Sequence, residues 1–148
     1  MKRFIIYTLF ICAAFSTLAQ GWQYDDDKSI IVSSPELSSD NELIMLGLVA
    51  AEFNNSEHVL LYLNGAVTRF ALRDNQQYIV ASFYDGKKSS KWAVKSSTIK
   101  GQNILAITNA SKFIDRLCTS DMFSITLPIE DMGVTTFTFI SDGYPLDW

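Results

Sequence analysis

Few side chains in this sequence belong to the types that carry out nucleophilic, acid–base or metal chemistry near neutral pH. His58 is the only histidine, and Cys118 is the only cysteine besides Cys12 near the N-terminus. A zinc site takes three or four His, Cys or carboxylate ligands, and the spacing of His58 and Cys118 does not indicate a shared site. A catalytic thiol needs a base beside it in an electropositive pocket. We therefore expect His58 to be a loop histidine at a strand start and Cys118 to be a partly buried, unreactive thiol.

Carboxylates are more frequent, but they form no recognisable pattern. An EF-hand loop starting at Asp25 would need glycine at its sixth position and glutamate at its twelfth. Those positions hold Ile30 and Glu36, so the acids from Asp25 to Asp27 indicate a solvated segment rather than a calcium site. Glycosidases use a pair of carboxylates. Acids also favour turn geometry, and four stand in expected turns: Asp85, Glu130, Asp131 and Asp142. The sequence predicts no catalytic residue, metal site or cofactor, and a small glycan-directed hydrolase remains the alternative.

Aromatic residues near the ends of the expected strands are better candidates for recognition. Trp92 follows a long loop over residues 85–91, and loops on a rigid scaffold often carry binding residues. Tryptophan and tyrosine rings can stack on a sugar or grip a peptide. The same rings could instead close the ends of the hydrophobic core. Core closure is the favoured interpretation. If the protein works by binding, Trp92 is the expected exposed anchor, and the candidate binding residues are Trp92, Asp85, Tyr24 and Trp148.

The N-terminal segment has the order of a secretory signal peptide. Lys2 and Arg3 precede an apolar run over residues 4–15, and Thr17-Leu18-Ala19 places small side chains where a signal peptidase reads them. The run is shorter than the roughly 20 residues that span a bilayer, so no stable membrane anchor is expected. We expect a cut after Ala19 that removes residues 1–19, with a cut at Gly21 as the runner-up. The remainder, 20–148, has the size of a single domain of an exported protein, periplasmic or secreted.

The charge of the chain limits its partners. The net charge is −4, and loss of Lys2 and Arg3 with the signal makes it about −6. Proteins that bind nucleic acid present a basic patch, and no basic run occurs here. We therefore expect neither nucleic acid nor anionic lipid as a partner. A protein or another component of the cell envelope is the expected one.

An alternation of apolar and polar residues dominates the chain and predicts strands. Residues 136–139 alternate threonine with phenylalanine, which indicates a strand with one solvent-exposed face and one buried face. Pro128 cannot donate a ladder hydrogen bond, so it should lie at a strand end or on an edge. The fold class expected is mainly β, an antiparallel β-sandwich or partly closed barrel. Its strands are expected near residues 30–32, 43–49, 59–63, 67–72, 78–84, 92–94, 104–107, 122–129 and 134–140.

One turn and one helix stand out in this pattern. Asn64-Gly65 lies between two apolar runs and predicts a two-residue hairpin turn, because both residues tolerate positive φ. The apolar residues Ala110, Phe113, Ile114 and Leu117 follow helical spacing. This predicts one short helix over about 110–118, packed on the sheet and capped by the side chain of Asn109 or Ser111.

The order of these features resembles a known group of proteins. The residues that carry the likeness are Trp22-Gln23-Tyr24, then 80–87 followed by Trp92, the 109–118 helix, and Phe137-Thr138-Phe139 before Gly143. They resemble exported bacterial proteins of the type VI secretion accessory family VasI/TagO and related prophage-encoded proteins. Paired cysteines are common in that family and are missing here. The resemblance implies a β-sandwich in the bacterial envelope with no established catalytic residues. We expect an exported, non-enzymatic binding or accessory protein.

Overall fold

The computed structural model describes residues 21–25, 27–64, 69–84, 86–99 and 102–141. Ten strands and one helix, α2 (Ala110–Cys118), make up this part of the chain. The strands are β1 (Gln23–Asp25), β2 (Lys28–Val32), β3 (Glu36–Leu37), β4 (Leu43–Phe53), β5 (Ser56–Asn64), β6 (Tyr78–Phe83), β7 (Ser90–Ile99), β8 (Gln102–Ile107), β9 (Met122–Ile129) and β10 (Gly133–Ile140).

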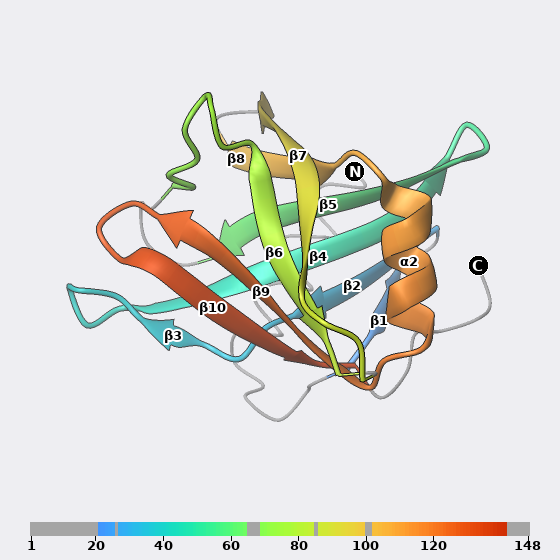
Figure 1. The fold of residues 1–148 in the computed structure, drawn as a ribbon, viewed down its shortest axis with the longest axis horizontal. Coiled ribbons are helices and arrows are strands. Elements are labelled where there is room, and N and C mark those ends of the chain that lie inside the picture. The colour runs from blue at the N-terminus through green and yellow to red at the C-terminus, as the bar shows by residue number, and fades with distance from the viewer. Residues whose placement is uncertain (1–20, 26, 65–68, 85, 100–101, 142–148) are drawn as a thin grey trace.

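All the strand pairs are antiparallel, and they join in the order β1-β2-β4-β5-β8-β7-β6-β9-β10, with β3 beside β4. The sheet curls into a half-barrel, with α2 lying across one end (Figure 1). This confirms the expected class, a mainly β antiparallel fold with a single short helix among the described residues. Because the sheet does not close, β1 and β10 are left as its edge strands.

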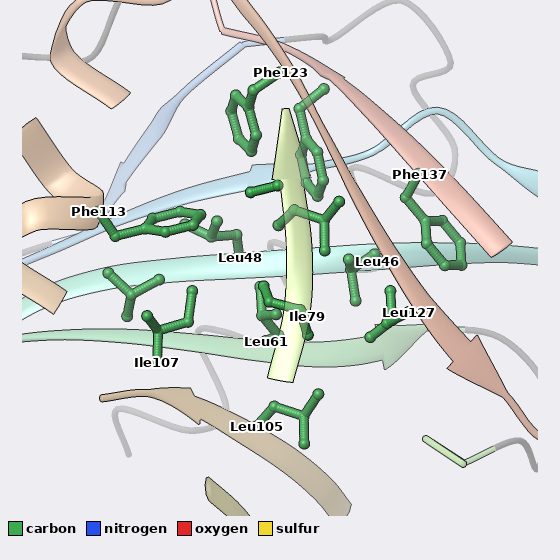
Figure 2. Packing of buried hydrophobic residues seen from close by; sticks show 14 of the residues in the cluster. Leu46, Leu48, Leu61, Ile79, Leu105, Ile107, Phe113, Phe123, Leu127 and Phe137 are labelled. Atoms are coloured by element: carbon green, nitrogen blue, oxygen red, sulfur yellow. The ribbon is translucent and has the colours of Figure 1, made fainter. Parts of the chain in front are cut away.

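The core lies on the concave side of this sheet. Phe137 and Phe139 of β10 are fully buried, while the threonines between and before them lie toward solvent, as the alternation predicts. Figure 2 shows Phe123 and Phe137 from β9 and β10 pointing toward the same interior as Leu46 and Leu48 of β4. Each fully buried leucine or phenylalanine contributes roughly 1.5–3 kcal/mol through removal of its apolar surface from water. The core therefore ties the two ends of the curled sheet together.

The helix has the predicted bounds, and its buried residues are the predicted stripe, Ala110, Phe113, Ile114 and Leu117. Phe113 points from α2 into the core (Figure 2). The expected side-chain cap is wrong. Asn109 makes no such hydrogen bond, and the Ser111 hydroxyl donates instead to Glu57 Oε2 at 2.9 Å. Burial of one apolar face therefore holds the helix in place without a side-chain cap.

The expected hairpin at Asn64-Gly65 is wrong in its pairing. β5 ends at Asn64, and its neighbours in the sheet are β4 and β8. Of the expected strand over 67–72, only Phe70 forms a β-bridge among the described residues, and it does so with Ile129 of β9. Gly65 itself lies outside the described residues. Phe70 thus lies beside β9 rather than beside β5, and it joins the core there.

Other expected strands are present and differ mainly in length. β4 runs on to Phe53 and β7 begins at Ser90, beyond the apolar runs from which they were predicted. The short β3 lies in the segment expected to be a loop. Pro128 is near the end of β9, as predicted, and its carbonyl accepts a hydrogen bond from the amide of Ala71.

Two expectations concern residues outside the described ranges. The residues of the expected signal peptide, 1–19, are not among the described residues, and neither is Trp148. Within the described ranges, no helix has the length and apolar character needed to cross a membrane.

Candidate functional site

Trp92 is half-buried and packs against the core, as the core-closure interpretation expects and the exposed-anchor interpretation does not. Its ring meets Phe113 edge-to-face at 4.9 Å between centroids and lies 6.4 Å from Phe83. The indole nitrogen donates to the Ser90 hydroxyl at 2.9 Å. The Arg116 guanidinium covers the Phe83 ring from the helix at 4.6 Å. Trp92 thus belongs to the contact between α2 and the sheet, where its loss would loosen the fold.

The other sequence-predicted binding residues are not brought together with Trp92. Tyr24 lies on the edge strand β1 and is 58% exposed. Asp85 and Trp148 fall outside the described residues. In the antiparallel register of β1 and β2, Asp25 lies opposite Lys28, so part of the acidic run is at the end of a hairpin.

His58 and Cys118 belong to different elements, β5 and α2. His58 lies within β5, opposite Ala51, rather than in the expected loop. Burial raises the pKa of the Cys118 thiol, and the negative charges of Asp115 and Glu57 raise it further. A raised pKa lowers the fraction of thiolate, which is the nucleophilic form. Among the described residues, no group of three or more His, Cys, Asp or Glu side chains is placed to hold a metal ion.

Among the described residues, an open groove of about 500 Å³ lies between the β3 region and β10. Both walls lie at the left of Figure 1, where β3 and the turn between β9 and β10 approach each other. The wall on the β3 side is lined by Glu36, Leu37, Ser38 and Ser39. The wall on the β10 side is lined by Asp131, Met132, Val134, Thr135 and Thr136. We refer to the open groove as the β3–β10 groove.

One wall of this groove is the outer edge of β10. Ser141 donates to the Asp121 carbonyl, one pair beyond Ile140 and Met122. Antiparallel pairs alternate between hydrogen-bonded and non-hydrogen-bonded, so Thr135 bonds to β9 while Val134 and Thr136 do not. The backbone groups of Val134 and Thr136 therefore point into the groove. They have no backbone partner among the described residues.

A single hydrogen bond closes one end of the groove. The Ser34 amide donates to the Thr138 carbonyl at 2.9 Å, which fits the outward direction of that carbonyl. Pro35 follows, and by the alternation of pairing its backbone faces away from β10. The Ser33 hydroxyl accepts from the Leu46 amide and donates to the Ser34 carbonyl, which fixes the bend before β3. Beyond the Ser34–Thr138 hydrogen bond, the segment that begins at Glu36 and the β10 strand line opposite walls of the groove.

The opposite wall presents a second free backbone edge. Ser38 donates to the Glu42 carbonyl, so by the same alternation Leu37, which pairs with Leu43, has backbone groups directed away from β4. Leu37 is the apolar residue among the lining residues of this wall, and Leu43 is its neighbour on β4. Leu37 and Leu43 are each 59% exposed, and Val134 on the facing wall is 76% exposed.

Charge around the groove has one sign. The two segments that form its walls, residues 36–43 and 129–136, contain five carboxylates and no Lys, Arg or His: Glu36, Asp40, Glu42, Glu130 and Asp131. Glu36 and Asp131 line the groove directly. Arg69 approaches this region through its backbone, since its carbonyl accepts from the Glu130 amide. The lining thus favours a ligand that carries positive charge.

The sequence analysis did not identify this groove. Leu37, Leu43 and Val134 were visible only as isolated apolar residues in polar segments, and their two segments lie far apart in the chain. A usable signal was present in β10, which carries neither a charge nor a proline along Gly133–Ile140. Edge strands are normally protected by such residues.

Comparison of the chain with protein-family models, with curated proteins and with solved structures finds no match.

Proposed function

We propose that this is an exported, non-enzymatic binding protein of the cell envelope, and that the β3–β10 groove is its binding site. The observation that carries the proposal is the combination of free backbone groups and exposed apolar side chains on both walls of one groove. Val134 and Leu37 supply the apolar surface, and each belongs to a strand with an unpaired edge. Exposed apolar side chains cost free energy in water, so contact with a partner would stabilise them.

The export half of the proposal rests on the sequence. Lys2 and Arg3, the apolar run and Thr17-Leu18-Ala19 have the order of a signal peptide. The intact mass of protein recovered from the periplasm or medium tests it. A chain that begins at Gln20 or Gly21 supports export with cleavage, and a chain that still begins at Met1 contradicts it.

The rival function, glycan hydrolysis, would draw on Glu36 and Asp131, because both line the groove. Such an enzyme needs one carboxyl group kept protonated by an apolar enclosure. Asp131 stands exposed in the turn between β9 and β10, where water solvates its charge. The groove is therefore better suited to holding a ligand than to protonating one.

Photocrosslinking in the cells that make the protein tests the binding site. A photoreactive amino acid is placed at Val134 or at Leu37, and at Phe53 as a matched control. Phe53 is 60% exposed and ends β4, away from the groove lining. Defined adducts from Val134 and Leu37 that Phe53 does not give support the proposal. Equal labelling at all three positions, or none at the groove, refutes it.

A further inference from the structure

We infer that the ligand of the β3–β10 groove is a single extended peptide segment of another protein, which pairs with the free edge of β10 as an added strand. This inference rests on the proposed function and specifies the chemistry of the partner: apolar side chains at alternate positions and at least one lysine or arginine. Strand addition of this kind obtains its affinity from backbone hydrogen bonds and its specificity from alternate side chains.

The backbone of β10 provides the template. The amides and carbonyls of Val134 and Thr136 face the groove, spaced two residues apart, as an added antiparallel or parallel strand requires. Opposite them, the backbone groups of Leu37 also face away from their own strand pair. A peptide in the groove would therefore meet donors and acceptors on both of its edges.

The side chains of the walls determine which residues the peptide needs. Val134 and Leu37 lie on the outer faces of their strands, with Leu43 beside Leu37. Met132, in contrast, packs against the core. Successive side chains of an extended peptide point to opposite faces. One set would contact Val134 and Leu37, so apolar residues are expected at every second position.

The charge of the walls adds a second requirement. Glu36 and Asp131 line the groove, and the adjoining segments add Asp40, Glu42 and Glu130. A basic peptide residue beside Glu36 or Asp131 would be attracted, while an acidic one would be repelled, and such pairs control specificity and association rate.

A second copy of this chain fits the groove less well than a peptide does. The β3 segment faces β10 across the groove, so an approaching sheet, which brings neighbouring strands with it, would collide with residues 36–39. A lone strand brings no neighbours. The carboxylates on the walls also favour a basic ligand, and this chain has a net charge of −4.

The experiment is a selection from a phage-displayed library of random twelve-residue peptides on the purified protein. Thr136→Pro serves as the blocked variant and Thr136→Ala as its matched control. Proline removes the amide that faces the groove, while both substitutions remove the hydroxyl that contacts Thr126 at 2.8 Å. The expected pool shows apolar residues at every second position and a Lys or Arg. A synthetic peptide from it should bind Thr136→Ala normally and Thr136→Pro at least tenfold more weakly.

Charge and backbone are then tested separately on the same synthetic peptide. Asp131 has φ of 64°, and asparagine tolerates this conformation, so Asp131→Asn removes the charge and keeps the turn. It should weaken binding of the basic peptide severalfold and leave a neutral peptide unaffected. N-methylation of the peptide amides that face β10 should abolish binding, whereas N-methylation of the alternate set, which faces only Leu37, should weaken binding less.

Three results would overturn the inference. These are no enrichment over the blocked variant, equal affinity for Thr136→Pro and Thr136→Ala, or a dimer in sedimentation that Thr136→Pro dissolves. If photocrosslinking at Val134 still gives a defined adduct in any of these cases, the binding function stands and only strand addition fails. If the crosslinks fail as well, the groove is not the binding site.

Discussion

Moving a proline by one residue along β10 tests the strand register on which the groove depends. Thr135 forms a hydrogen-bonded pair with Leu127, so its amide donates into the ladder, whereas the amide of Thr136 faces away from β9. Thr135→Pro therefore removes one ladder hydrogen bond and Thr136→Pro removes none. Both variants force the same φ and lose a threonine side chain. Thr135→Ala and Thr136→Ala remove the same hydroxyl contacts, with the Gly133 carbonyl and with Thr126, so subtracting these controls isolates the amide.

The size of that difference follows from the site. The lost hydrogen bond contributes about 0.5–1.5 kcal/mol, and the carbonyl it leaves unpaired costs about 1–3 kcal/mol when buried. Leu127 is 1% exposed, so the cost for a buried unpaired carbonyl applies to it. Thr135→Pro should thus cost about 2–4 kcal/mol more than Thr136→Pro. At roughly 3–4 °C per kcal/mol for a chain of this size, the melting temperatures should differ by about 10 °C.

Urea unfolding of the purified protein, followed by tryptophan fluorescence, measures this difference directly. Thr136→Ala provides the reference for loss of the hydroxyl contact with Thr126. Equal destabilisation by the two prolines, or a larger effect at position 136, would show that the Thr136 amide faces β9. In that case the free edge of β10, and with it the argument for strand addition, would be wrong.

Three further predictions concern the fold and the thiol. Phe113→Ala should cost about 3–5 kcal/mol in urea unfolding, because the ring is fully buried, and Lys112→Ala, on the exposed face, should stay within about 0.5 kcal/mol; similar small effects would place the helix off the core. Gly47→Ala should cost about 1–3 kcal/mol because its Cβ would overlap the Tyr62 ring across the strand pair, and the same substitution in a Tyr62→Ala background should cost under about 0.5 kcal/mol; an undiminished cost there would contradict the overlap. The Cys118 pKa is raised, so iodoacetamide should alkylate it more slowly at pH 8 than it alkylates N-acetylcysteine, and equal rates would argue against the burial.

The raised pKa of Cys118 also gives a direction for stability against pH. The folded state holds the thiol proton to higher pH than the unfolded state does, so this contribution is complete below the ordinary thiol pKa near 8.5. It is lost as the pH rises above that value. Because the side chain is partly exposed, Cys118→Ser should flatten only a small part of the alkaline decline in unfolding midpoint.

Local patterns in the sequence were sufficient to predict the helix and the strands that bury one regular face. The spacing of Phe113 and Leu117 placed α2 at its observed bounds, and the alternation of Thr136 and Phe137 placed β10 and its dry face. These patterns work because burial of one side of a helix or strand is encoded in neighbouring residues. The mainly β class followed from the same signal.

Pairing and exposure depended on residues distant in the chain. Asn64-Gly65 has good turn chemistry, yet β5 pairs with β4 and β8 because the core requires Phe70 on the other side of the barrel. The exposure of Trp92 depends on Phe113, which lies on the helix and packs against the Trp92 ring.

The sequence by itself determined the apolar residues and their spacing, and hence most of the strands and the helix. It also determined the acidic charge of residues 36–43 and 129–136. The tertiary structure alone decided that these two acidic segments face each other, and that the edge of β10 beyond the Ser34–Thr138 hydrogen bond is left open. The physical reason is that side-chain alternation is a local property, while the closure of a curled sheet depends on the packing of its whole core.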